Sequence, residues 1–124
     1  MNLLLDTHIL LWWLDDNPIL KESERAAISN PDNIIIVSSA VIWEIRIKQG
    51  IGKLELPSEY FEVIKKQGFE FLPITFEHAY ALGDLPMHHR DPFDRMLISQ
   101  AKHQKLTIIT RDNIIKKYDV KVLS

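Results

Sequence analysis

Cysteine is absent from the 124-residue sequence, and its absence excludes several classes of protein at once. Without cysteine there is no disulfide scaffold, no thiol nucleophile, and no zinc or iron–sulfur site with thiolate ligands. Long hydrophobic runs are also missing, since the longest, Ile9–Leu14, is far below the roughly 20 residues that a membrane-spanning helix needs. Because Asp6 and His8 interrupt the apolar stretch near the start and no basic leader precedes it, we expect no signal peptide and a cytoplasmic protein.

The sequence also lacks a strong excess of charge of either sign. A formal net charge of −2 is not the mark of a nucleic-acid-binding protein. This net charge does not exclude a nucleic-acid-binding protein either. Acids that bind metal ions are neutralised and do not repel the substrate, and without four such acids the formal net charge is positive. The length and the 46% share of hydrophobic residues indicate one globular domain spanning residues 1–124.

Short β-branched runs alternate with helical segments, which is typical of an α/β domain with a mainly parallel sheet. The expected strands, apolar enough to be covered on both faces, are Asn2–Leu5, Ile34–Ser38, Glu70–Ile74, Leu106–Ile109 and Val120–Leu123. The expected helices are Ser39 to Gln49 with Gly50 as the stop, Ser58 to Gln67, Thr75 to about Gly83, Pro92 to about Gln104 with Asp91 as N-cap, and a short helix after Asp112.

Four acids fall where a parallel sheet would bring them together. Asp6 ends the first expected strand, and Asp112 follows the fourth. Glu44 lies in the helix after the second strand, and Asp94 in the first turn of the helix before the fourth. Because the carboxyl ends of parallel strands share one edge, where ligands bind in such sheets, we expect the four side chains to converge.

Each acid also has a purely structural explanation. Asp91 and Asp112 suit helix N-caps, and Asp94 would stabilise a helix N-terminus. Glu44 is spaced for an ion pair with Lys48. Its neighbours in the sequence are nearly all apolar, however, and a carboxylate there is costly unless it is paired or binds a cation. Together the acids favour a metal site over coincidence.

Oxygen ligands without cysteine select a hard cation, so we expect Mg²⁺, with Mn²⁺ as the alternative. Such ions bridge phosphate oxygens and activate water, which makes phosphodiester hydrolysis the expected reaction. His88 and His89 are interpreted as a loop that contacts substrate phosphate, in preference to a zinc site. Trp12 and Trp13 are expected to divide between core and surface, and base stacking is the less favoured role.

The assembled motifs resemble those of the PIN-domain ribonucleases, and specifically the VapC-like toxins of bacterial toxin–antitoxin pairs. The resemblance covers almost the entire chain, and its third segment is the most specific. The segments that carry it are Leu4–His8, Val37–Ser38 with Ile42–Ile45, His88–Arg95 followed by Leu97–Ile98, and Thr110–Asp112.

The resemblance implies a Rossmann-like three-layer α/β/α sandwich with a five-stranded, mainly parallel sheet, and Mg²⁺-dependent endonucleolytic cleavage of RNA. It implies that Asp6, Glu44 and Asp94 are catalytic, metal-binding acids. Asp112 matches a fourth such position, where other members can carry a different polar residue. The residues expected to support these acids or contact the substrate are Thr7, Arg90, Asp91, Arg95 and Thr110.

The resemblance also implies a partner antitoxin, encoded beside the toxin, whose flexible segment occludes the active site, and it implies a homodimer. Two alternatives remain open. One is a structure-specific DNA nuclease with the same metal chemistry, against which the small size slightly favours RNA. The other is a non-catalytic partner-binding domain that keeps the fold but holds no metal, against which the four intact acids argue.

Overall fold

Five parallel strands form one sheet in the order β3-β2-β1-β4-β5 in the computed structural model, which describes residues 1–124. The strands are β1 (Asn2–Leu5), β2 (Ile34–Ser38), β3 (Glu70–Leu72), β4 (Thr107–Ile109) and β5 (Lys121–Leu123). All five expected strands are confirmed, with small differences at their ends. The sheet is wholly parallel. The expected coverage on both faces holds for β1, β2 and β4, but the edge strands β3 and β5 carry exposed residues, among them Phe71, which is 49% exposed.

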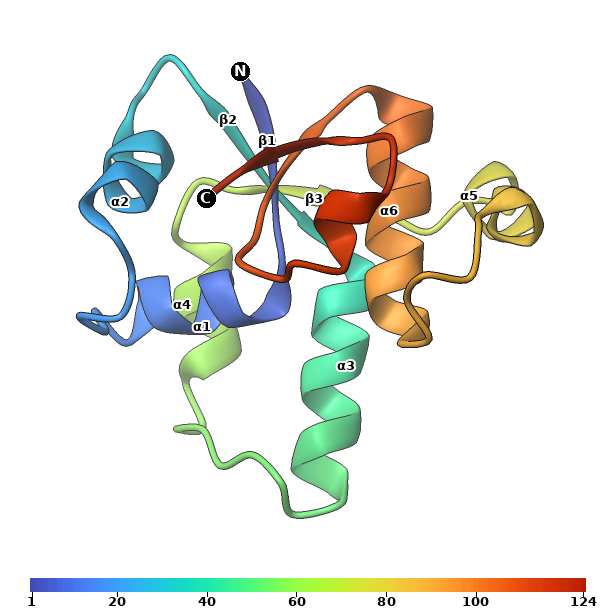
Figure 1. The fold of residues 1–124 in the computed structure, drawn as a ribbon. Helices are drawn as coiled ribbons and strands as arrows, with labels where there is room; N and C mark the ends of the chain where they lie inside the picture. Colours follow the sequence, from blue (N-terminus) through green and yellow to red (C-terminus); the bar gives the residue numbers. More distant parts are fainter.

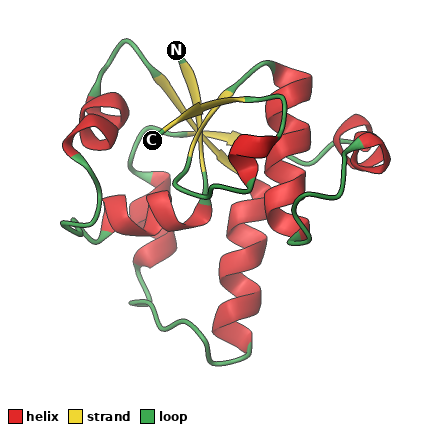
Figure 2. Cartoon of the chain, viewed as in Figure 1, coloured by secondary structure: helices red, strands yellow, loops and turns green.

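Helices cover both faces of this sheet, which confirms the three-layer α/β/α sandwich. They are α1 (Thr7–Leu14), α2 (Glu22–Ser29), α3 (Ser39–Gly50), α4 (Tyr60–Lys65), α5 (Phe76–Ala81) and α6 (Pro92–Gln104), with 3₁₀ turns η1 (Leu82–Asp84) and η2 (Ile115–Lys117). Helices α1, α2 and α4 lie on one side of the strands and α5 and α6 on the other, while α3 extends beyond the edge of the sheet (Figures 1 and 2). None of the helices has the length and apolar character needed to cross a membrane.

Strand β1 occupies the centre of the sheet because its last three residues are leucines that suit burial on both faces. Leu3, Leu4 and Leu5 have no exposed surface, and β1 pairs with β2 on one side and β4 on the other. Burying each leucine contributes about 1.5–3 kcal/mol, so β1 anchors the core. The order of strands along the sheet reverses beside β1, and the crevice outside the carboxyl ends at such a point is where ligands bind.

Two helices, α1 and α2, were not expected from the sequence. Helix α1 is apolar around most of its circumference, so no amphipathic period marks it as a helix. Helix α2 lacks an ordinary N-cap side chain, because Lys21 stands at that position. The carboxylate of Glu24 instead accepts the backbone N–H of Lys21 at 2.7 Å. The usual start signals are therefore missing from one helix and the usual periodicity from the other.

Ser58 does not cap α4, contrary to expectation. Its hydroxyl donates to Oε2 of Glu59 at 3.1 Å, and α4 begins only at Tyr60 without a side-chain cap. Strand β3 ends at Leu72, earlier than expected, because Pro73 has no N–H for the strand ladder. Local hydrogen bonding and the missing proline donor thus shorten both elements.

Helix ends were predicted with mixed success. Gly50 lies inside the last turn of α3, and the left-handed residue beyond it is Gly52, with φ +74°. Thr75 and Asp91 cap α5 and α6 as expected. Asp112 accepts the N–H of Ile114 at 2.8 Å, but the expected final helix is only the 3₁₀ turn η2.

Candidate active site

A cavity of about 350 Å³ opens at the carboxyl edge of the sheet, beside β1. Five acids line it, among them the four expected to converge: Asp6, Glu44, Asp91, Asp94 and Asp112. Only two cationic side chains, Lys48 and Arg111, accompany them. The remaining lining residues are Thr7, His8 and Trp12. A cavity with five carboxylates suits a hard divalent cation, which prefers oxygen ligands.

Asp6 lies between the end of β1 and the start of α1, and hydrogen bonds fix both of its carboxylate oxygens. Its Oδ1 accepts the backbone N–H of Ile9 at 2.9 Å, which caps α1, and its Oδ2 accepts the hydroxyl of Thr110. The same hydroxyl accepts the N–H of Asp112 at 3.0 Å, so Thr110 fixes two acids relative to each other. Burial raises the pKa of Asp6, although the bonds from Thr110 and Ile9 favour the ionised form.

Glu44 lies on the inner face of α3 and is only 6% exposed. The hydroxyl of Thr7 donates to its Oε1 at 2.5 Å, and Nζ of Lys48 lies 2.8 Å from its Oε2. The ion pair with Lys48 that the spacing suggested is therefore present. Glu44 nevertheless lines the acidic cavity, and each of its carboxylate oxygens keeps a further lone pair that could bind a cation.

Asp94 carries the strongest sign of crowded negative charge. Burial raises its pKa to about 7, the nearby Asp91, Asp6 and Glu44 act in the same direction, and His89 opposes them. Asp91 is the N-cap of α6, since its Oδ1 accepts the N–H of Phe93 at 2.8 Å and of Asp94 at 3.1 Å. Without a cation, ionising Asp94 near neutral pH is unfavourable.

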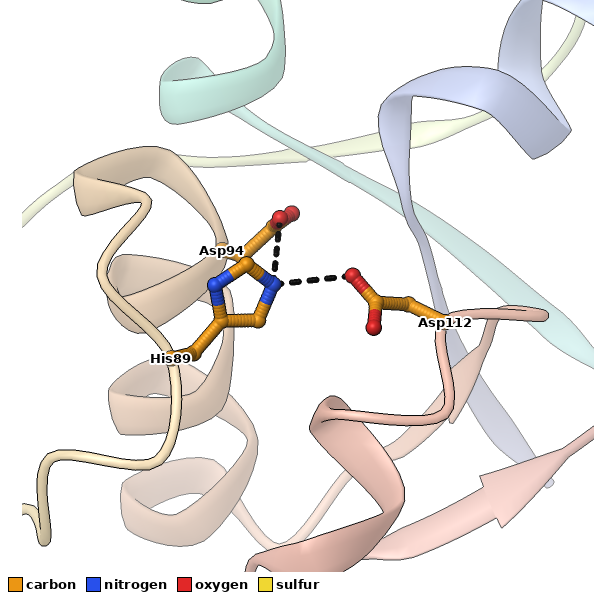
Figure 3. A group of neighbouring side chains, drawn as sticks. All are labelled: His89, Asp94 and Asp112. Atoms are coloured by element: carbon orange, nitrogen blue, oxygen red, sulfur yellow. Dashed lines mark hydrogen bonds and ion pairs between the residues drawn. The ribbon is translucent and has the colours of Figure 1, made fainter.

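The ring of His89 lies between two of the acids (Figure 3). Its Nε2 is 2.8 Å from Oδ2 of Asp112 and 3.0 Å from Oδ2 of Asp94, and the three ligand-type atoms lie within 4.8 Å of one another. Its Nδ1 accepts the backbone N–H of Asp91 at 3.2 Å. Since Nδ1 accepts, we assign the proton to Nε2, which then donates to both carboxylates and has no lone pair for a metal.

His89 is therefore a positioning group and not a metal ligand. The sequence-based interpretation, in which its loop contacts substrate phosphate, does not fit a ring bound between two carboxylates. His88 points elsewhere, with its ring edge-on to Tyr118. Partial burial raises the pKa of Asp112, but hydrogen bonds from His89 and from the N–H of Ile114 outweigh it and hold that pKa below its ordinary value.

Neither arginine of the same motif lines the cavity. The guanidinium of Arg95 donates to the carbonyls of Leu82, Leu85, Pro86 and His89 and to the hydroxyl of Tyr118. It thus braces the loop that carries His89. Arg90 is exposed and has no hydrogen bond or ion pair with another residue. Of the two suggested roles, support of the acids suits Arg95, and only Arg90 is available to a substrate.

Sequence reasoning did not single out Glu24, whose side chain is 0% exposed. Its Oε1 accepts Nη2 of Arg111 at 2.5 Å, and its Oε2 accepts Nε of the same guanidinium at 3.2 Å. The guanidinium carbon of Arg111 also lies 4.9 Å from the centre of the Trp12 ring. No motif marks this pair, because 87 positions separate Glu24 from Arg111 in the sequence.

Comparisons with known proteins agree with the observed fold. A family model described as the PIN domain matches residues 3–121. Comparison with curated protein sequences gives no match.

Solved structures show the same fold at low sequence identity. VapBC2 from Rickettsia felis, bound to a DNA fragment from its promoter, is 18% identical with a TM-score of 0.74, covering 99% of this chain and 98% of that one. DNA-bound VapBC from Salmonella typhimurium is 18% identical with a TM-score of 0.75, covering 99% and 97%. VapBC-5 from Mycobacterium tuberculosis, a member of the VapBC family of toxin–antitoxin systems, is 17% identical with a TM-score of 0.58, covering 98% and 95%.

Proposed function

Because the chain belongs to the PIN domain family, whose members are nucleases, we propose that it is a divalent-metal-dependent endoribonuclease and the toxin of a toxin–antitoxin pair. The observation that carries the proposal is the cavity at the carboxyl edge of the sheet, where five carboxylates face two cations. Such a charge balance repels a phosphodiester unless cations intervene. The cavity therefore suits metal-assisted hydrolysis of nucleic acid.

The side chains present fit Mg²⁺ or Mn²⁺. Five carboxylates line the cavity, and the pKa of Asp94 is raised first by burial and further by the neighbouring acids Asp91, Asp6 and Glu44. Asp6, Glu44, Asp94 and Asp112 would hold the ion. When bound, it supplies positive charge to phosphate oxygens and lowers the pKa of water.

Other residues of the chain keep these acids in place. The hydroxyls of Thr7 and Thr110 bind Glu44 and Asp6, and Nε2–H of His89 joins Asp94 to Asp112. Groups that orient ligands in this way typically change metal affinity or activity by 10–100-fold when removed. The side chain of Lys48 is 38% exposed, so its ammonium can also meet a substrate phosphate.

Similarity to VapBC structures supports the proposal of a cognate antitoxin, and a homodimer in the cytoplasm is proposed on the same analogy. RNA is preferred over DNA as substrate because the chain has no added arm to grip a duplex. The DNA nuclease and the metal-free partner-binding domain are the alternatives that an experiment must separate.

We expect the purified protein, free of antitoxin, to cleave RNA with Mg²⁺ or Mn²⁺ and to lose this activity in EDTA. Ca²⁺ should substitute poorly, because the chemistry needs a small ion with well-ordered coordination. Gel assays on total RNA, single-stranded DNA and duplex DNA in parallel measure this. Undiminished cleavage in EDTA would overturn metal dependence, and cleavage of DNA alone would favour the DNA nuclease. Mg²⁺ titration without any heat of binding would favour the partner-binding domain.

Expression of the protein alone should arrest bacterial growth, and co-expression of the product of the adjacent gene should restore it. The physical reason is occlusion, since a partner segment seated in the acidic cavity excludes RNA. Growth curves measure the effect, with Glu44→Gln as the inactive control. Normal growth of cells that accumulate soluble wild-type protein would remove the toxin assignment while leaving the nuclease assignment to the cleavage assay.

A further inference from the structure

Trp12 is the only apolar side chain among the ten that line the acidic cavity. It lies on α1, one turn after His8, and the two rings are 5.8 Å apart with a tilt of 37°. His8 is exposed and lines the same cavity. Two planar rings therefore meet at the wall of a site that is otherwise polar and charged.

The indole of Trp12 is held by a support that reaches back into the protein. The Arg111 guanidinium lies over its ring at 4.9 Å. That guanidinium is fixed in turn by both carboxylate oxygens of buried Glu24 and by the carbonyl of Ile19. A buried carboxylate needs such a partner, and a planar guanidinium packs well on an aromatic face. The Glu24–Arg111–Trp12 stack thus sets the orientation of the ring before any ligand binds.

The neighbouring tryptophan shows what a purely structural indole looks like here. Nε1 of Trp13 donates to Oε1 of Gln67 at 3.1 Å. Nε1 of Trp12 finds no acceptor in the protein, and it is not enclosed. Trp12 therefore offers a ring surface and a free N–H donor in the cavity, next to the acids, whereas the polar atom of Trp13 is already used.

We propose that a nucleobase beside the scissile phosphate stacks on Trp12. The inference rests on the proposed function, because its ligand is the substrate of the nuclease. Stacking needs a base whose face is not already covered by a neighbouring base pair, so the RNA at this position is single-stranded, in a loop or in an unpaired segment. Any base has a face to offer, so the contact selects for an unpaired base more than for its identity.

The test is single-turnover cleavage, with Mg²⁺, of a single-stranded oligoribonucleotide of about 12 nucleotides, which lies within the roughly 4–16 nucleotides that single-strand-binding OB folds cover. The same oligonucleotide is made with one abasic residue at each position flanking the cut. For the wild type, one abasic position should lower kcat/KM by about 5- to 100-fold, the size expected for one lost stacking contact, mainly through KM. Trp12→Leu should lose a similar factor on the intact oligonucleotide and respond to no abasic position.

Two variants serve as controls. Trp12→Phe keeps a ring and should retain most of the activity and the abasic response. Trp43→Leu removes a tryptophan that does not line the cavity. Trp43 lies on α3, is 55% exposed, and packs edge-on against Phe93. The Trp43→Leu variant should behave as the wild type. The comparison of intact with abasic RNA is made within each variant, so a general loss of stability in Trp12→Leu does not imitate the expected result.

Three outcomes would overturn the inference. The first is that Trp12→Leu cleaves the intact oligonucleotide as the wild type does, and the second is that it keeps the wild-type abasic response. In either case the wild type is active, so the proposed function stands and only the stacking role is lost. If wild-type protein cleaves no RNA with Mg²⁺ or Mn²⁺, the proposed function fails and the stacking role fails with it.

Discussion

Replacing Glu44 with glutamine, or Asp6 or Asp94 with asparagine, should lower RNA cleavage on the order of 1000-fold while the fold remains intact. Each neutral amide removes one negative charge from the set of oxygens that would hold the metal. Charge stabilisation by the ion is worth several kcal/mol in the transition state, and about 4 kcal/mol corresponds to this factor. Single-turnover cleavage rates, with circular dichroism as the check on folding, measure the effect.

Two neighbouring acids provide matched controls. Asp91→Asn should be nearly silent, because asparagine caps a helix about as well as aspartate and its Oδ1 can accept the same two N–H groups. Asp112→Asn should be milder than Asp94→Asn, since Asp112 is the more exposed carboxylate, at 30% against 21%, and its pKa is lowered whereas that of Asp94 is raised by burial. If Asp91→Asn is as inactive as Asp94→Asn, Asp91 belongs to the metal site and not only to the cap of α6.

Metal-free Asp94→Asn should be more stable than the metal-free wild type at pH 8. The rise in the pKa of Asp94 corresponds to at most about 4 kcal/mol, from which the weakened contact with His89 subtracts, so the Tm should rise by roughly 5–15 °C. Burial and the surrounding acids Asp91, Asp6 and Glu44 raise the folded-state pKa of Asp94 to about 7, and the opposing contact with His89 does not offset them. The neutral amide removes this penalty. Thermal melts of both proteins in EDTA at pH 5 and pH 8 measure the difference.

The dependence on pH has a definite sign. Because the folded-state pKa of Asp94 lies above the unfolded value, its proton contributes stability that is fully present below the unfolded pKa, near 3.8. That contribution is lost as pH rises through about 7. The advantage of Asp94→Asn over the wild type should therefore be larger at pH 8 than at pH 5.

Added Mg²⁺ should relieve the same repulsion in the wild type and raise its Tm, as any ligand of the native state does. Asp94→Asn should gain less from Mg²⁺. A simpler role for Asp94, as an acid that stabilises the N-terminus of α6, predicts the opposite sign. The variant would then lose about 0.3–1 kcal/mol and keep the wild-type response to Mg²⁺. That result would remove Asp94 from the metal site.

The sheet was predictable because its signal is local. The runs Leu3–Leu5 and Ile35–Val37 are buried, and short apolar runs rich in β-branched residues are typical of parallel strands. The apolar run Ile9–Leu14 is a helix, so an apolar run alone does not separate the two. Helices α1 and α2 escaped prediction because α1 has no polar face and α2 has no capping side chain at Lys21. Their positions depend on packing against the sheet, which no local pattern encodes.

The acids of the site were predictable for a related reason. Asp6 and Asp112 follow strands, and parallel strands end at one edge, so topology alone brings them together. Of the residues that hydrogen-bond to the acids, the sequence predicts only some. Thr7 and Thr110 stand next to acids in the motifs and were expected to orient them. The bridge from His89 to Asp112 and the Glu24–Arg111 pair join residues 23 and 87 positions apart, and no spacing rule reports such contacts.

The contact between Thr110 and Asp6 joins residues 104 positions apart, and it has a consequence for synthesis. Strand β1 is made first but is flanked in the sheet by β4, whose residues 107–109 are made near the other end. Contacts of such long range form late, because the intervening chain must first exist and then close a large loop. On a translating ribosome, Asp6 is synthesised long before Thr110 and Asp112, so it lacks these contacts until the end of the chain has been made. Under the proposed function, a protein built in this order cannot assemble its acids, or cut the message that encodes it, until the codons for residues 107–112 have been read.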